Sequence, residues 1–504
     1  MHFDEWPVEL QTTWKEFEAS VIEYGRMLLH QVPTTMKAQV TTLEEIEAVT
    51  RHMTQTLAQT LAQEWTHETV QALEPPAPPA CPTCAIAMRK VDVRALTKLG
   101  IFGIYHWQRA YYVCPAGHGG LAPTDAILGL GPERFTAALA QAVTAFAVNL
   151  PFDQIPPLMN TLVDLPLDGD TIRRVAERVG GVAEATEQAA IAAVTAAMGA
   201  EGEEGATETS AVGWASDAEA ELNGGVAPDA LIVSVDAAMA PFHEGHAYHE
   251  VKVAVCQPLQ RVSPTPSASE APLWQPLQAP DYCRGLEPRP EFWPRVRAHA
   301  LQCGLGSPTC RLVALVGDGA DWIWRYGVRY LGGPGRCLVE ILDIFHAREH
   351  LWAYARGYFD TEAAATAWAR PLNHGLETDG PGPILDAMAA LEAHHPGANP
   401  TIVQEHHQYF VHQASRMDYP RYRALGLPIG SGIIEGTCKT LVKERLDAGG
   451  MWWTRVGAQA IGTLRALYRS GRWRQFWAER PYAAAHRRPG ADAQSPQAPT
   501  SQVA

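Results

Sequence analysis

The chain has 504 residues, of which 46% are hydrophobic and 19% charged, which is typical of a globular protein of about three domains at roughly 150 residues each. This composition excludes fibrous and wholly disordered proteins. Forty Lys and Arg against 55 Asp and Glu leave a formal net charge of −15. That charge argues against a nucleic-acid partner only if it is spread evenly over the chain.

The amino terminus and the cysteine content predict a cellular compartment. Residues 1–6 lack a basic stretch followed by an apolar core, so no secretory signal is expected. No apolar run reaches the roughly 20 residues needed to cross a bilayer, so no membrane partner is expected. Nine cysteines, an odd number, suit a reducing compartment. We therefore expect a cytoplasmic protein whose thiols are free or metal-bound.

The first predicted region is helical and covers residues 1–74. Apolar side chains such as Leu57 and Leu61 recur at helical spacing among Glu, Gln and Thr. This pattern predicts two or three amphipathic helices that serve packing or self-association. The proline-rich residues 75–79 then predict a stiff extended linker, because proline supplies no backbone donor and restrains its neighbour.

Two short cysteine motifs enclose an aromatic-rich segment. Cys81 and Cys84 form a CxxC motif, and Cys114 and His118 form a CxxxH motif. A two-residue spacing lets both thiolates face one tetrahedral Zn²⁺, and three Cys with one His fill all four positions. The alternative is a chance pairing of cysteines in a reducing compartment. The pattern favours a structural zinc in a zinc-ribbon-like unit at residues 81–123, with no position left open for a reaction.

A second helical region is predicted at residues 124–198, with a helix-turn-helix-like role in DNA binding. Residues 167–175 look like a turn, an N-cap and a helix start that carries Arg173 and Arg174, which are candidates for recognising DNA. Residues 199–228 carry acidic side chains and no Lys or Arg among Gly, Ala, Ser and Thr. This composition predicts an acidic disordered linker that accounts for part of the net charge.

Three carboxylates are the central candidates for catalysis. Two apolar runs that read as buried strands end in Asp236 and in Asp318, and a later helical region contains Glu435. If the two strands are neighbours in one sheet, their ends converge, and the carboxylates repel one another unless cations lie between them. Two Mg²⁺ or Mn²⁺ ions at about 4 Å would neutralise the site and clamp the attacking and leaving oxygens of a phosphoryl transfer.

Asp318 and Glu435 could also occupy their positions without any catalytic role. Asp318 precedes a glycine, as turn residues commonly do, and Glu435 alone could occupy any solvated helix position. The context favours the catalytic interpretation, because a Gly-rich entry precedes Glu435 and three basic residues follow it, namely Lys439, Lys443 and Arg445.

With these motifs the chain resembles the DDE transposases of bacterial insertion sequences, in the Kra family, a branch related to the Mutator-like elements. The resemblance covers roughly residues 80–477. It is carried by the cysteine motifs and by segments at residues 234–236, 249–252, 317–324, 341–351 and 426–453, of which the last is the most specific.

The resemblance implies an α/β fold with a ribonuclease H-like catalytic domain and an all-helical insertion, preceded by helical segments and a small zinc-ribbon-like unit. The implied parts are the first part of the catalytic core at residues 229–358, the helical insertion at 359–425, the final core helices at 426–480 and a disordered tail at 481–504.

The resemblance also implies a function and its partners. The chain would be a transposase that binds the terminal inverted repeats of its element and catalyses metal-dependent DNA cleavage and strand transfer, as a homo-oligomer. Asp236, Asp318 and Glu435 would hold two catalytic Mg²⁺ or Mn²⁺ ions. Asp343 and His346 would form the D-x-x-H signature of this branch and lie near the DNA.

Basic charge is concentrated near the carboxyl end. Residues 418–490 contain thirteen Lys and Arg against five Asp and Glu, a net charge of +8. Trp452 and Trp453 lie among them, which suits phosphate contact combined with stacking on unpaired bases. The sequence therefore predicts a DNA path along the helix of Glu435 and its basic flank.

Two other functions stay open at this stage. A zinc-containing DNA-binding regulator could have kept the fold of a transposase without its reaction. Residues 346–350 also match HxxEH, the inverted zinc-peptidase signature in which two His one helical turn apart bind a catalytic zinc beside a Glu. A five-residue pattern arises easily by chance, and no third ligand motif accompanies it, so the transposase interpretation is favoured.

Overall fold

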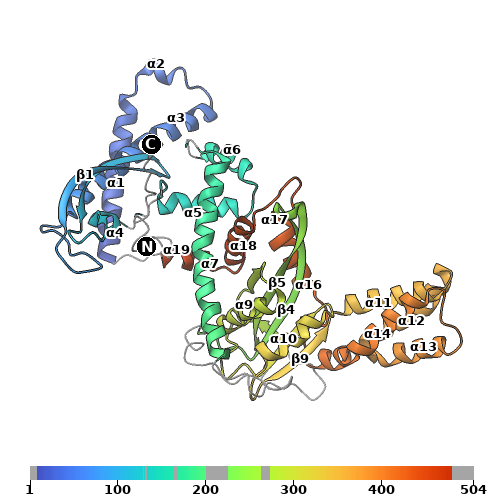
Figure 1. The fold of residues 1–504 in the computed structure, drawn as a ribbon. Coiled ribbons are helices and arrows are strands. Elements are labelled where there is room, and N and C mark those ends of the chain that lie inside the picture. The colour runs from blue at the N-terminus through green and yellow to red at the C-terminus, as the bar shows by residue number, and fades with distance from the viewer. Residues whose placement is uncertain are drawn as a thin grey trace, which may run out of the picture. The chain divides into compact units, whose positions relative to one another are not determined.

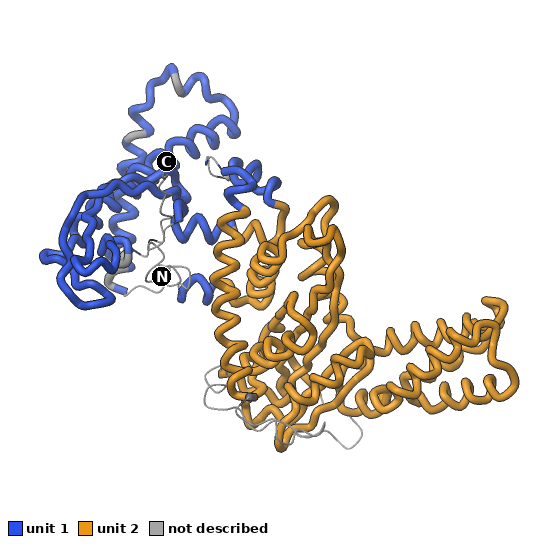
Figure 2. The backbone as a smooth tube through the Cα atoms, in the orientation of Figure 1, with its two compact units in different colours: residues 1–143, 152–172, 474–504 blue, residues 144–151, 173–473 orange. Residues whose placement is uncertain are grey.

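The computed structural model divides into two compact units, which Figure 2 distinguishes by colour. Unit 1 comprises Met1–Val143, Phe152–Ile172 and Arg474–Ala504, and unit 2 comprises Thr144–Pro151 and Arg173–Trp473. The structure describes residues 8–128, 130, 133–162, 165, 167–199, 225–262 and 273–479. Most of the predicted acidic linker and all of the predicted tail at 481–504 lie outside the described residues. Among the described helices, none is long and apolar enough to cross a membrane.

Unit 1 begins with three helices, α1 (Val8–Gln31), α2 (Thr34–Lys37) and α3 (Leu43–Ala72), which confirms the predicted amphipathic helices. Helix α3 starts at a capping box: the Thr42 side chain accepts a hydrogen bond from the backbone of Glu45, and the Glu45 carboxylate accepts one from the backbone of Thr42. This reciprocal pair satisfies backbone donors that the first helical turn leaves unpaired.

A small antiparallel sheet follows, with strand order β1-β2-β3. Its strands are β1 (Arg89–Gly100), β2 (Gly103–Val113) and β3 (Gly120–Leu121). Helix α3 packs on this sheet through hydrogen bonds and apolar contacts. The side chain of Gln59 donates to the carbonyl of Ile104 at 3.2 Å, and Val70 is buried in one cluster with Tyr105 and Trp107.

The region after this sheet is mainly helical, as expected. It contains α4 (Pro123–Ile127), α5 (Ala137–Ala147), η2 (Phe152–Gln154), α6 (Ile155–Leu162) and α7 (Gly169–Gly199). The start of α7 confirms the predicted N-cap, since the Asp168 carboxylate accepts a hydrogen bond from the backbone N–H of Thr171 at 2.8 Å.

Unit 2 is built on a six-stranded mixed sheet, so the chain has an α/β fold. Strand order is β6-β5-β4-β8-β9, and β7 also pairs with β5. The pairs β4–β5, β5–β6 and β5–β7 are antiparallel, whereas β4–β8 and β8–β9 are parallel. The strands are β4 (Ala230–Phe242), β5 (Ala247–Arg261), β6 (Trp274–Pro276), β7 (Asp281–Gly285), β8 (Leu312–Gly317) and β9 (Cys337–Leu342).

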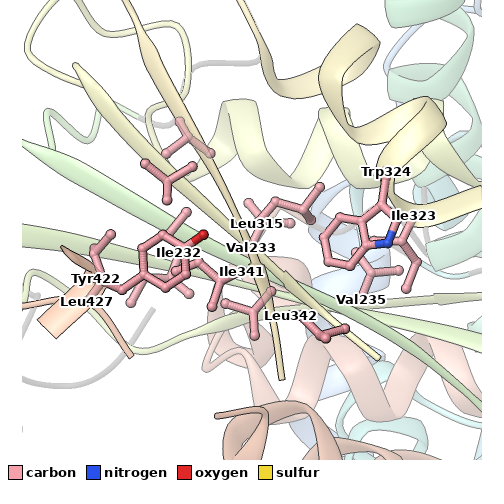
Figure 3. Close-up of a cluster of buried hydrophobic side chains, with 14 of the residues drawn as sticks. Ile232, Val233, Val235, Leu315, Ile323, Trp324, Ile341, Leu342, Tyr422 and Leu427 are labelled. Atoms are coloured by element: carbon pink, nitrogen blue, oxygen red, sulfur yellow. The ribbon is translucent and has the colours of Figure 1, made fainter. Parts of the chain in front are cut away.

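Parallel neighbours need a crossover connection, and helices supply it here. Helix α9 (Arg289–Gln302) precedes β8, and α10 (Asp321–Leu331) connects β8 to β9. Figure 3 shows the core beside these strands, where Val233 of β4, Leu315 of β8 and Ile341 of β9 are all fully buried. Burial of each such side chain stabilises the fold by roughly 1.5–3 kcal/mol, which fixes the strands that carry the candidate carboxylates.

Helices follow the last strand and form an arm that projects from the sheet (Figure 1). They are α11 (Ile344–Tyr358), α12 (Glu362–Asp379), α13 (Gly382–Glu392), α14 (Pro400–Gln413) and α15 (Tyr419–Ala424), with the 3₁₀ turn η4 (Ala414–Arg416) between the last two. The helical character expected for residues 359–425 is confirmed.

The final part of unit 2 is also helical and contains a π-helical turn, a feature often found at functional sites. The elements are α16 (Gly432–Thr437), the π-helical η5 (Cys438–Lys443), α17 (Glu444–Leu446) and α18 (Arg455–Arg469). Helix α19 (Trp473–Ala478) begins at the last residue of unit 2.

Strand β9 ends at Leu342, because Asp343 caps α11 by accepting the backbone N–H of Phe345. The described residues between 258 and 290 contain the end of β5, the strands β6 and β7 and the start of α9. Pairing with β5 orders these short strands, and their local sequence does not reveal that partner.

A buried network of charges joins α7, β7 and α9. The guanidinium of Arg295 is almost fully buried and forms ion pairs at 2.7–2.8 Å with Glu184, Glu187 and Glu287. Next to it, the His299 ring lies 2.6 Å from Asp281 through Nδ1 and 2.6 Å from Glu187 through Nε2. Buried charges of this kind need every partner, since a lone buried charge is costly.

His299 should make the stability of unit 2 depend on pH. Burial opposes the charge, but Asp281 and Glu187 outweigh it and raise the pKa of His299 to about 9. A raised folded-state pKa gives a stabilisation that is complete below about pH 6.5 and is lost as the pH rises through about 9. The loss is of the order of 3 kcal/mol. Denaturant midpoints at pH 6.5 and 9.5 measure it.

The matched variants are His299→Gln, which removes this titration, and His412→Gln, which changes an exposed histidine of α14. We expect the wild type and His412→Gln to lose stability between the two pH values, and His299→Gln to lose less. Equal losses in all three proteins would contradict the assignment.

Candidate functional site

The four residues of the two cysteine motifs come together in unit 1. The ligand atoms of Cys81, Cys84, Cys114 and His118 all lie within 4.8 Å of one another. The Cys84 and Cys114 sulfurs are 3.6 Å apart, and His118 Nδ1 lies 3.7 Å from Cys114 Sγ and 3.9 Å from Cys81 Sγ. The cluster could therefore hold a structural metal such as zinc.

Backbone hydrogen bonds within the first motif favour the thiolate form of Cys81. Amide groups of Thr83 and Cys84 hydrogen-bond to the sulfur of Cys81 and lower its pKa to about 6. The thiolate is the form that binds a metal, so the short CxxC turn favours the ligand state before any ion binds. The second motif lies between β2 and β3, where Gly117 and Gly119 adopt positive φ angles that suit glycine in a tight turn.

Asp236 lies on β4, and Asp318 directly follows β8, the parallel neighbour of β4. In the register of β4 and β8, Ala230 pairs with Leu312 and Ser234 with Val316, a constant separation of 82 residues. The same separation divides Asp236 from Asp318, so extending the register by two residues brings these side chains to one region of the sheet. The two strands are neighbours, as predicted, but β4 does not end at Asp236: it continues to Phe242 because it stays paired with β5, so Asp236 lies within its strand.

The electrostatics of Asp236 reflect this placement. Burial and the negative charge of Asp318 raise the pKa of Asp236, while the backbone N–H of Ala237, at 2.6 Å, lowers it. The buried thiol of Cys438, on the π-helical turn, donates to Asp236 Oδ2 at 3.5 Å. Oxygen donors that repel one another are suited to a divalent cation such as Mg²⁺ or Mn²⁺.

Glu435 joins the site through three other side chains. The Ser431 hydroxyl lies 2.8 Å from Glu435 Oε1 and 2.8 Å from Asp343 Oδ2. It has a single proton, so it donates to one of these carboxylates at a time. Asp343 Oδ2 also lies 2.7 Å from His346 Nδ1. Glu435 is thereby held at the start of α16 next to the first turn of α11.

His346 links the two halves of the site. Its hydrogen bond with Asp343 and the charge of Asp318 raise the pKa of His346 to about 9, although burial opposes the charge. At neutral pH the ring is therefore an imidazolium. Its positive charge also acts on Asp236. The three candidate ligands do not form a cluster as close as the cysteine–histidine group, which is the only such group within the described part of the chain.

The residues predicted to contact DNA fall into two groups. Lys439 and Lys443 are exposed on η5, Trp452 is half-buried, and Arg174 is exposed on α7. Arg173 is partly exposed and forms an ion pair with Glu177 one helical turn away, at 2.9 Å. All of these side chains are at least partly exposed, so a ligand could reach them from the solvent.

The second group requires a correction. Arg445 is 1% exposed, donates from Nε to the carbonyl of Ala147 at 2.8 Å and lies over the ring of Trp453. Trp453 is buried and donates from Nε1 to the carbonyl of Leu446 at 3.0 Å. Asp343 is fully buried. In the described conformation these three side chains are buried in the fold, so none of them is available for the direct contact with DNA that was predicted for Arg445 and Trp453.

The HxxEH pattern does not form a metal site in the described structure. His346 is engaged by Asp343, whereas the ring of His350 stacks on Tyr409 with centroids 3.5 Å apart. His350 Nδ1 lies 2.9 Å from His406 Nδ1. Residues 346–350 contribute no member to the metal-ligand cluster found among the described residues.

Sequence reasoning missed Ser431 and Cys438 as residues of the site. Ser431 stands four residues before Glu435, a spacing that places two side chains on the same face of a helix, and this signal was available. For Cys438 no local signal exists, because only the tertiary fold brings it to Asp236, 202 residues earlier in the chain.

No model of a known protein family matches the chain, and no curated protein matches it.

Proposed function

We propose that the chain is a DNA transposase of an insertion sequence, with Asp236, Asp318 and Glu435 as its catalytic carboxylates. The observation that carries the proposal is that Asp236 lies on β4 and Asp318 directly follows its parallel neighbour β8, close enough for the charge of Asp318 to raise the pKa of Asp236. The sheet order, with one antiparallel and one parallel neighbour beside β4, supports a ribonuclease H-like core with a helical insertion. The cysteine–histidine cluster supports a zinc-ribbon-like unit before it.

In the proposed reaction the carboxylates of Asp236, Asp318 and Glu435 would hold two divalent cations. When bound, such ions activate water or a 3′-hydroxyl as nucleophile and stabilise the leaving oxygen of a phosphodiester. Ser431 orients Glu435, and Asp343 orients His346. The imidazolium of His346 places a positive charge where a negatively charged phosphate would approach the two aspartates.

DNA is the proposed partner, through contacts with the terminal inverted repeats and the target. Lys439, Lys443 and Trp452 present basic and aromatic side chains after Glu435, where phosphate contact and base stacking would act together. The exposed Arg174 supports a second contact on α7.

The test is a cleavage assay on DNA that carries the inverted repeats flanking the coding region. We expect strand cleavage at the element ends that requires Mg²⁺ or Mn²⁺, is abolished by EDTA and is absent on DNA with scrambled ends. Specific binding of the ends without cleavage would favour the non-enzymatic regulator, and no specific binding would contradict both functions.

Transposition requires two element ends to be held together, which favours a multimer, and α3 offers an apolar surface for a second copy of the chain. Seven apolar residues on one face of α3, spaced three or four residues apart, are 42–70% exposed: Leu43, Ile46, Val49, Met53, Leu57, Leu61 and Trp65. A continuous exposed apolar face of this kind marks a protein–protein contact, whereas single exposed apolar residues need no partner.

Charges placed on this face should separate the copies. We expect Leu57→Lys combined with Leu61→Lys to convert a dimer or larger assembly into a monomer, as measured by light scattering after size-exclusion chromatography. His52→Lys, on the other side of α3, should leave the assembly intact. A monomeric wild type, or an assembly that survives the double replacement, would refute self-association through α3.

A further inference from the structure

Helix α14 of the helical arm holds the turn that carries Asp318. The hydroxyl of Tyr409 donates to the backbone carbonyl of Asp318 at 3.0 Å, and the side-chain amide of Gln413 donates to the backbone carbonyl of Gly319 at 2.8 Å. Tyr409 is partly buried and Gln413 is 4% exposed. Two successive carbonyls of one turn are thus bound by two residues one helical turn apart on α14.

The turn and α14 fit closely. Gly319 has a φ of +103°, a conformation that residues with a side chain rarely adopt. A Cβ at this position would lie 2.7 Å from the hydroxyl oxygen of Tyr409 and 3.1 Å from Leu342 Cδ1. Inside the turn, Asp318 Oδ1 accepts the backbone N–H of Ala320 at 3.0 Å. Glycine is therefore required for this approach, and the carboxylate is tied to the same turn.

The two donors are themselves held in place. The ring of Tyr409 stacks on His350 of α11 with an interplanar angle of 7°. The side-chain oxygen of Gln413 accepts Arg416 Nη1 at 3.0 Å, and Arg416 Nε pairs with Glu340 of β9 at 2.7 Å. Contacts with α11 and β9 thus fix Tyr409 and Gln413 relative to the sheet. Their hydrogen bonds therefore hold the turn of Asp318 in one position.

We infer that Tyr409 and Gln413 are positioning residues that fix the Asp318 carboxylate from the helical arm. This inference rests on the proposed function, in which Asp318 holds a divalent cation. Ligands of a catalytic site must be held within about 0.5 Å of their productive position, and residues outside the ligand set usually provide that restraint. Hydrogen bonds to the carbonyls of residues 318 and 319 restrain the backbone from which this ligand projects.

The test compares two conservative replacements in the full-length, zinc-loaded protein. Tyr409→Phe removes the hydroxyl that binds the turn. Tyr354→Phe removes a hydroxyl from the same arm, one that binds Glu392 at 2.9 Å. Mn²⁺ binding is measured by titration calorimetry without DNA, and end cleavage is measured as a function of Mn²⁺ concentration. Thermal unfolding shows whether both variants are folded.

We expect Tyr409→Phe to weaken Mn²⁺ binding about fivefold, the factor that corresponds to one hydrogen bond of about 1 kcal/mol. The Mn²⁺ concentration for half-maximal cleavage should rise by the same factor, with the rate at saturating Mn²⁺ largely retained. Tyr354→Phe should bind Mn²⁺ as the wild type does.

Two results would overturn the inference, and they are distinguishable. If the wild type binds Mn²⁺ and cleaves DNA while Tyr409→Phe binds Mn²⁺ equally well, or if Tyr354→Phe weakens binding by the same factor, the positioning role fails and the proposed function stands. If the wild type neither binds Mn²⁺ nor cleaves DNA, the proposed metal site fails, and the role of Tyr409 fails with it.

Discussion

Replacement of Asp236 or Asp318 by Asn is expected to lower the rate of end cleavage about 10³-fold, which corresponds to about 4 kcal/mol of lost transition-state stabilisation. Each replacement keeps the size of the side chain but removes a charged ligand from the site. Binding of the element ends should change little, because phosphate contacts made elsewhere supply most of that affinity. Single-turnover cleavage at saturating Mg²⁺, together with a binding titration at fixed salt, measures the two effects separately.

Asp321→Asn is the matched control for Asp318, since Asp321 is exposed in the first turn of α10, three residues further along the chain. It should cleave as the wild type does. Cleavage by Asp236→Asn or Asp318→Asn at the rate of the control would show that the assigned site is wrong.

Asp236→Asn should also stabilise the protein in EDTA. Burial and the charge of Asp318 raise the pKa of Asp236, so the ionised carboxylate costs free energy in the folded state at neutral pH. Removing the charge removes this cost, and the difference should disappear as the pH falls and the carboxyl group becomes protonated. A variant that unfolds at a lower temperature than the wild type in EDTA at pH 7 would contradict the electrostatic description.

Replacement of Cys114 by Ser is expected to abolish stoichiometric metal binding by the cysteine–histidine cluster and to unfold the two motifs. Structural Zn²⁺ contributes about 10–16 kcal/mol of apparent binding free energy in small zinc units, and one lost thiolate removes a quarter of the ligand set. We expect the zinc content to fall from one ion per chain to none at low free zinc. Hydrogen exchange over residues 81–121 should then become fast.

The control for this variant is Cys337→Ser, because Cys337 is an exposed cysteine at the start of β9, outside the cluster. It should retain one zinc ion per chain and normal protection of residues 81–121. A wild-type protein that contains no zinc, or a Cys114→Ser variant that retains it, would refute the assignment of these four residues as ligands.

Elements whose signals are local could be predicted from the sequence. The apolar runs before Asp236 and Asp318 predicted the first half of β4 and all of β8, since an uninterrupted run of buried residues needs no knowledge of its partner. The four cysteine and histidine ligands could be identified because each motif is a short turn that presents its own ligands. Helices α3 and α7 were predicted from apolar periodicity and N-cap chemistry.

Which side chains are accessible to a ligand depends on the tertiary structure. Arg445 and Trp453 belong to a basic, aromatic segment that resembles a DNA-binding surface in the sequence, yet packing against Ala147 and Leu446 buries them. Tyr409 contacts the turn of Asp318 only because the fold brings together two residues that are 91 positions apart. Periodicity reports which face of an element is apolar, but burial and hydrogen bonding depend on partners distant in the chain. The strands beside Asp236 and Asp318 could therefore be predicted, whereas the burial of Arg445 and Trp453 and the contact of Tyr409 with the Asp318 turn could not.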